Sequence, residues 1–143
     1  MYISDAKRLN AAGARKIMDT AITRAREAKL AVTIAIVDAG GHLVLLERME
    51  GGKFHTVHSA TTKAVCAASS KRNTGSTGAV GQSLDVLHAL GLALAAGPER
   101  WTPMEGGCPV MAGDECIGGV GVAGGNWEFD EKVAREAAES IKG

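Results

Sequence analysis

GGCPVMAGDECIGGVGVAGGNWEFDEKVAREAAESI, residues 106–141, is the stretch that decides the fold. Its pattern of apolar runs and turn residues predicts, in order, a strand over 109–112, a tight turn at Gly113-Asp114, a strand over 116–122, a glycine loop at Gly124-Gly125 and a closing helix. Two short strands joined by a Gly-Asp turn form a hairpin, so this end of the chain is expected to supply half of an antiparallel sheet.

Three glycines, Gly118, Gly119 and Gly121, fall inside the second of these strands. Glycine weakens a strand interior because it has no side chain to pack, and it often marks a place where something approaches the backbone closely. We therefore expect another backbone, a helix or a ligand to lie directly against this strand. The pair Gly106-Gly107 just upstream extends the same expectation.

Working outward, the rest of the chain predicts the remaining elements. They are a helix capped by Ser4 or Asp5 that runs to Lys29, strands over 30–37 and 42–48, and helices over 55–70 and 83–96. The order α-β-β-α-α-β-β-α predicts an α+β fold in which helices pack on an antiparallel sheet. No linker or low-complexity tract divides residues 1–143, so we expect a single domain.

Composition excludes several classes of protein. The chain has 143 residues, 45% hydrophobic but only 3% aromatic, so small aliphatic side chains must fill its core. Its formal net charge is +0, with no basic stripe, which argues against nucleic acid as a partner. Three cysteines without CxxC spacing indicate neither a disulfide framework nor a zinc knuckle. No run is apolar enough to be a signal segment or a membrane span, so we expect no membrane partner and a cytoplasmic location.

Several segments, taken together, resemble one family. They are LNAAGARKIMDTAITRA, VTIAIVDAGGHLVLLERMEG, TTKAVCAA, GGCPV, IGGVGVAGG and DEKVAREA, which follow in order over roughly residues 7–141. The combination resembles the GlcG/HbpS-like family, which includes haem-binding proteins and the C-terminal domains of PduO-type adenosyltransferases. The resemblance implies a PAS- or profilin-like fold that self-associates into dimers or higher oligomers. It also implies, from several members, binding of haem or a related tetrapyrrole, but no single reaction.

His55 and His58 are the sharpest candidates for a metal or haem ligand. They lie three residues apart at the start of a predicted helix, so both project from about the same face. Imidazole binds both zinc and haem iron, but zinc needs further ligands and no HExxH motif or Cys/His cluster supplies them. Two solvated histidines, or acid/base catalysis by His58, stay open as alternatives. We expect His42 at the surface and His88 as a structural histidine in an apolar helix.

Lys63 and Glu105 are, with His58, the candidate catalytic residues. Lys63 lies on the same helix as the histidines and either donates a proton or forms an ion pair with a carboxylate, such as that of Asp85 or Asp130. Glu105 directly precedes the glycine pair and is the carboxylate best placed for proton transfer.

The remaining candidates would hold a cofactor. Arg48, at a strand end, can meet a haem propionate bidentately, and Met49 is a possible soft axial ligand. The pocket wall is expected from Gly106, Gly107, Pro109, Gly124 and Gly125, with Trp101 and Trp127 flanking the glycine loops. A GxGxxG match at Gly119, Gly121 and Gly124 does not indicate a nicotinamide site, because its first glycines lie within the strand and only one helix follows.

Two functions from different classes follow. The first is a haem- or tetrapyrrole-binding module in which the glycine loops and the start of the 55–70 helix converge on one pocket. The second is a small lyase or isomerase, encoded in a catabolic operon, that acts by acid/base chemistry on a small organic acid or catabolic intermediate.

Overall fold

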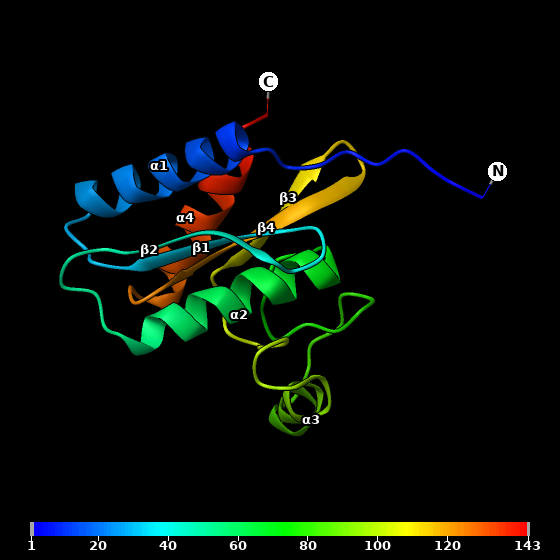
Figure 1. The fold of residues 1–143 in the computed structure, drawn as a ribbon. Coiled ribbons are helices and arrows are strands. Elements are labelled where there is room, and N and C mark those ends of the chain that lie inside the picture. The colour runs from blue at the N-terminus through cyan, green and yellow to red at the C-terminus, as the bar shows by residue number, and fades with distance from the viewer. Residues whose placement is uncertain (1, 143) are drawn as a thin grey trace.

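The protein folds into one four-stranded antiparallel sheet with helices on both faces (Figure 1). The computed structural model describes residues 2–142. Its elements are α1 (Ala11–Glu27), β1 (Thr33–Asp38), β2 (Leu43–Arg48), α2 (His55–Ser70), α3 (Val86–Ala96), β3 (Gly107–Ala112), β4 (Glu115–Ala123) and α4 (Trp127–Glu139). The element order and the α+β class expected from the sequence are confirmed.

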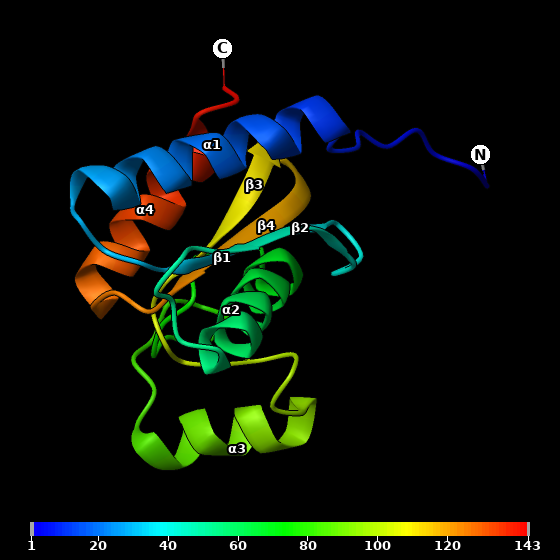
Figure 2. The same ribbon diagram turned by 60° about the vertical axis from the view of Figure 1, so that its left-hand side comes forward.

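The strand order is β2-β1-β4-β3, and every neighbouring pair is antiparallel. The two hairpins therefore meet through their inner strands, where Ile34 lies opposite Val122. Helices α1 and α4 cover one face of the sheet and α2 covers the other, while α3 lies beyond α2 (Figure 2). Within residues 2–142, no helix is both long enough and apolar enough to cross a membrane.

Two helices begin later in the chain than the sequence predicts, because other residues cap them. The first helix begins at Ala11, after Asn10, whose side chain accepts a hydrogen bond of 2.8 Å from the amide of Gly13. Ser4 and Asp5 are therefore not its caps. Asp85 caps α3 in the same way by accepting from the amide of His88, so this helix begins at Val86 and not at Ser83. Side-chain oxygens of this kind satisfy the first free amides of a helix.

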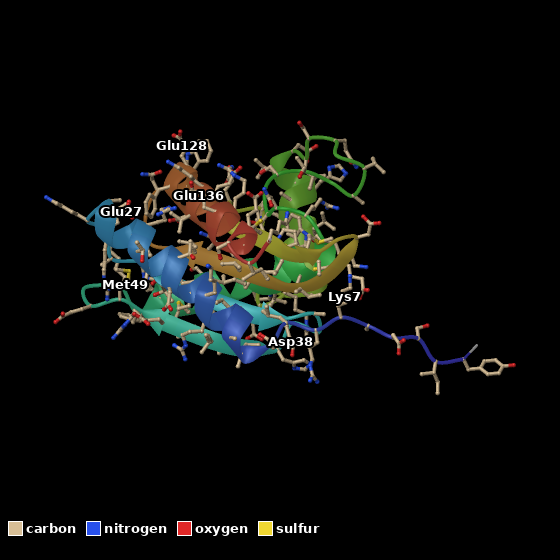
Figure 3. The ribbon with its side chains drawn as sticks, turned by 90° about the horizontal axis from the view of Figure 1, so that it is seen from above. Lys7, Glu27, Asp38, Met49, Glu128 and Glu136 are labelled. Atoms are coloured by element: carbon tan, nitrogen blue, oxygen red, sulfur yellow. The ribbon has the colours of Figure 1, made fainter. Side chains whose placement is uncertain are left out.

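The core has two unequal parts. On the α1 and α4 side, aliphatic side chains from the sheet and both helices form the larger cluster, including Ile17, Ile34, Val120 and Val133. On the α2 side, the buried cluster consists mainly of alanines, since α2 lies too close to the sheet for larger groups. Arg24 of α1 forms salt bridges with Glu27 of the same helix and with Glu136 of α4, the two glutamates labelled in Figure 3.

Three glycines let α2 lie directly on the sheet. A Cβ atom on Gly107, Gly119 or Gly121 would collide with a backbone carbonyl oxygen of α2, those of Lys63, Ala64 and Ala60 respectively. Gly121 is the tightest of these positions, since its added Cβ would also lie 2.7 Å from the amide nitrogen of Ala64. The close approach expected from glycines inside a strand is thus confirmed, and at Gly119 and Gly121 the approaching group is the α2 backbone. At Gly118 it is the carbonyl oxygen of Val37 in β1.

Helix α3 lies outside the core, although its apolar sequence is typical of a buried helix. No other helix or strand of residues 2–142 lies against it, and only Ala89 of its residues is buried. The sequence predicts His88 as a structural histidine in an apolar helix, but the structure does not place it in the core. The side chain is exposed, with Nδ1 at 2.9 Å from Oδ1 of Asp85, because the helix does not enter the core of its own chain.

Gly121→Ala should destabilise the fold strongly, because the added methyl group must displace the α2 backbone and not a flexible side chain. We expect the free energy of unfolding in urea to fall by about 3 kcal/mol or more. Gly91→Ala is the matched control. Gly91 lies within α3 with no atom near its missing Cβ, so alanine there should be neutral or stabilise by up to about 1 kcal/mol. Equal effects of the two substitutions would contradict this account of the packing.

Candidate functional site

Two adjoining cavities lie beside α2. The first, here called the Lys63 cavity, has a volume of about 300 Å³. Its lining consists of Lys53, His55, Thr56, Ser59, Lys63, Met104, Glu105, Ala123, Gly124, Gly125, Trp127 and Asp130. The second, the Trp101 cavity, has a volume of about 260 Å³ and is lined by His58, Ser59, Thr62, Lys63, Ala93, Pro98, Trp101, Thr102, Pro103 and Met104. The two share Ser59, Lys63 and Met104 and so form one continuous region.

The centre of this region is a buried pair, Lys63 and Asp130. Lys63 Nζ lies 3.4 Å from Oδ2 of Asp130, and the two side chains are only 8% and 5% exposed. Lys63 Nζ also donates a hydrogen bond of 2.9 Å to the carbonyl oxygen of Val122. The other carboxyl oxygen, Oδ1 of Asp130, accepts from the amide of Gly125 at 3.1 Å. The pair thus joins α2 to the end of β4 and the start of α4.

Burial shifts the pKa of both partners toward the neutral form. Loss of solvent lowers the pKa of Lys63, and the attraction of Asp130 and then of Glu105 opposes this shift. Loss of solvent likewise raises the pKa of Asp130, against the attraction of Lys63. Since the two shifts bring the proton affinities of amine and carboxylate closer together, a proton can pass between them at a smaller free-energy cost than in water.

The glycine loops make room for this pair. A Cβ on Gly106 would lie 2.9 Å from Lys63 Nζ and 3.1 Å from Cβ of Asp130, and a Cβ on Gly125 would lie 2.7 Å from Oδ1 of Asp130. Gly106 and Gly124 also have φ values of 121° and 110°, a region that residues with a side chain rarely adopt. Both loops therefore require glycine in order to close on the pair.

The structure brings together most of the residues expected at the site. His55, Lys63, Glu105, Gly124 and Gly125 line the Lys63 cavity, whereas His58 lines the adjoining Trp101 cavity. Gly106 packs against Lys63, and Gly107 packs against the backbone of α2. Trp127 and Trp101 flank the region, one in each cavity, and both histidine side chains are exposed.

Arg48, Met49 and Pro109 do not line either cavity. Arg48 ends β2, the edge strand furthest from β3, and Met49 follows it (Figure 3). Met49 packs against the core on the α1 and α4 side. Pro109 lies within β3, opposite Gly119. His42, as expected, is exposed, and it lines a separate cavity of about 440 Å³ beside the turn between β1 and β2.

Asp130 is the site residue that sequence reasoning did not place. The sequence offers Asp130 only as one of two ion-pair partners for Lys63, and the structure selects it over Asp85. The local signal is an aspartate four residues after Asn126, which caps α4 by accepting from the amide of Phe129. In residues 2–142, no group of three or more His, Cys, Asp or Glu side chains is arranged to hold a metal ion.

Comparison with known proteins finds one family and several related structures. The family model described as haem degrading protein HbpS-like matches residues 9–139. A 15.0 kDa protein of the dhaT-dhaS intergenic region of Citrobacter freundii is 29% identical over 128 residues, 90% of this chain and 88% of that protein.

Among solved structures, the Klebsiella pneumoniae protein ORFY is 31% identical, with a TM-score of 0.83 over 98% of this chain and 95% of that one. A PduOC complex with haem is 26% identical, with a TM-score of 0.81 over 95% and 96% of the two chains. A double mutant of Streptomyces reticuli HbpS also has 26% identity and a TM-score of 0.81, over 99% and 92%.

Lys63→Met should destabilise the protein by on the order of 3 kcal/mol, because it leaves the buried carboxyl group of Asp130 without its main partner. Urea unfolding at pH 7 measures this loss. Lys53→Met is the matched control, since Lys53 lines the same cavity but is exposed, and we expect a change within about 0.5 kcal/mol. If both variants unfold at the same urea concentration, the pair does not stabilise the fold.

Proposed function

This chain belongs to the family of HbpS-like haem degrading proteins, and on that premise we propose that it binds haem or a related tetrapyrrole in the region formed by its two adjoining cavities. The observation that carries the proposal is the position of the two histidines, since His55 and His58 each line one of the cavities. Neutral imidazole is an ordinary axial ligand of haem iron. When bound, haem would supply redox and oxygen chemistry at this surface.

The rest of the lining suits a flat, largely apolar ligand. Trp127 and Trp101 offer aromatic surface, and Met104 lies where the cavities meet. Aromatic side chains pack well against planar ring systems. Lys53 supplies a positive charge for an acidic substituent of the ligand. These residues fit the group, whereas Arg48 and Met49 line neither cavity and are not part of this proposal.

We also propose that the protein self-associates through α3. Val86, Leu87, Leu90 and Leu94 are each more than half exposed, and the helix carries no charged residue between Val86 and Ala96. Contiguous apolar patches of this kind rarely stay exposed on a monomer. Because Ala93 of α3 lines the Trp101 cavity, a second copy packed on this helix would also lie close to the ligand region.

A second candidate function, acid/base catalysis on a small molecule, is favoured by a different observation. Lys63, Asp130 and Glu105 line one cavity, and the proton affinities of the first two are brought together by burial. Groups with shifted pKa values in a cavity are a common feature of catalytic sites. His58 lines the adjoining cavity and is the third acid/base candidate.

Titrating the purified protein with haemin should produce a Soret band that saturates at a fixed ratio of haem to protein. His55→Ala or His58→Ala should shift its maximum or weaken binding at least about tenfold, equivalent to about 1.4 kcal/mol, because an axial ligand to iron is lost. His42→Ala is the control, since this exposed histidine lines a different cavity. The proposed ligation would be ruled out if wild-type protein gave no Soret band with haemin. It would also be ruled out if the double variant His55→Ala/His58→Ala gave the same band as the wild type.

Replacing Leu87 and Leu90 by glutamate should convert the assembly to a species of about the 14.7 kDa chain mass, because charge cannot be buried in an apolar contact. Sedimentation velocity of wild type and variant measures this change. Leu43→Glu is the control, because Leu43 is an exposed leucine on β2, away from α3. A wild-type protein that sediments as a monomer at all concentrations would contradict self-association.

A further inference from the structure

We propose that Lys63 is a nucleophile that forms an imine with a short, uncharged aldehyde bound in the Lys63 cavity. The inference rests on the second candidate function above, to which it adds a substrate class and a covalent step. It does not depend on haem binding.

The hydrogen bonds of Lys63 leave one direction around Nζ open toward the cavities. An ammonium group has three protons to donate, whereas a neutral amine has two protons and a lone pair. Lys63 Nζ is held by two acceptors, the carbonyl oxygen of Val122 at 2.9 Å and Oδ2 of Asp130 at 3.4 Å. The lysine nevertheless lines both cavities, so its third direction is the one available to a ligand.

Asp130 is positioned to exchange protons with this amine. Its Oδ1 is held by the amide of Gly125, which orients Oδ2 toward Lys63. The lowered pKa of Lys63, caused mainly by burial, supports the same assignment, because an amine must lose its proton before it can attack a carbonyl group. A pair that served stability alone would not need to line a cavity, and apolar residues of similar volume often stabilise a fold as well or better.

The proposed step conserves atoms and electrons. The lone pair of Lys63 Nζ attacks the carbonyl carbon, and the electron pair of the C=O bond moves to oxygen, which takes a proton to give a carbinolamine. Nitrogen then loses one proton to Asp130, which passes that proton to the hydroxyl oxygen. The C–O bond breaks, oxygen leaves as water with its two protons, and the lone pair on nitrogen forms the C=N bond. The protonated imine carries a positive charge beside the carboxylate of Asp130. No oxidant or reductant takes part.

Charge and size of the cavity select the substrate class. Asp130 and Glu105 act directly on Lys63 and would repel a carboxylate on a substrate small enough to lie only beside Nζ, whatever Lys53 offers to a larger ligand. A short uncharged carbonyl compound avoids this repulsion. An aldehyde is favoured over a ketone because Nζ is buried beside Gly106 and Asp130, where the less crowded carbonyl carbon is easier to reach.

Reductive trapping tests the proposal. The full chain is incubated at pH 7 with a small amount of propionaldehyde and cyanoborohydride, and the labelled lysines are mapped by peptide mass spectrometry. Each trapped site gains the mass of the aldehyde less one oxygen atom. We expect Lys63 to be labelled at least about tenfold faster than Lys53, which lines the same cavity and serves as an internal control.

The pH dependence sharpens this comparison. The charged groups that act on Lys63 are Asp130 from α4 and Glu105 from the segment before β3. His55 and Lys53 also line the cavity. Because burial lowers the pKa of Lys63 below the ordinary 10.5, its advantage over Lys53 should be greatest near pH 7. The advantage should shrink as the pH approaches 10.5, where exposed lysines also lose their protons.

Lys63→Arg should abolish the label at this position and leave Lys53 labelling unchanged, with circular dichroism as a check of the fold. If that variant does not fold, the wild-type map decides alone. Labelling of Lys53 with none at Lys63 in folded wild-type protein overturns the proposal. Haemin titration separates the two functions: selective Lys63 labelling without a Soret band removes only the haem proposal, and a Soret band without Lys63 labelling removes only this one.

Discussion

The structure depends on the contact between the backbone of α2 and the glycines of β3 and β4. Gly107, Gly119 and Gly121 leave no side chain between strand and helix, so carbonyl oxygens of α2 lie where Cβ atoms would otherwise be. This close approach fixes the depth of the helix on the sheet. It is also what carries the side chain of Lys63 to the end of β4, where the chain turns into α4 and supplies Asp130.

Local sequence patterns could predict much of this fold, because many of its turns, strands and helices are determined by residues that are close together in the sequence. The β3–β4 hairpin follows from its Gly-Asp turn, and the bounds of α2 match the expected 55–70. Two features needed information from distant residues. The start of α1 depends on which of several polar side chains reaches a free amide, and Asn10 does so. The exposure of α3 could not be predicted from its sequence pattern, since an apolar helix has the same pattern whether its own chain or a second chain covers it.

The site residues also divide into those that the local sequence predicts and those that depend on the tertiary fold. The sequence could predict several residues of the site, because helix starts and glycine loops are recognised from neighbouring residues. These are His55, Lys63, Glu105 and the loop at Gly124-Gly125. The choice of Asp130 over Asp85 as the partner of Lys63 could not, since both aspartates lie at helix starts and only the tertiary fold decides which one α2 meets. Arg48 and Met49 were candidates as strand-end residues, but the order β2-β1-β4-β3 puts their strand at the opposite edge from β3.

The Lys63–Asp130 pair links the packing to the chemistry. Each group loses hydration on burial, and their mutual attraction only partly offsets that cost, which is why both pKa values move toward the neutral forms. The loops must also use glycine at Gly106 and Gly125 to make room for the pair. An alanine-rich core such as the one under α2 could be closed by apolar side chains at lower cost. A lysine amine beside a carboxyl group at the wall of a cavity instead suits the proposed imine formation, in which the amine must lose a proton before it attacks.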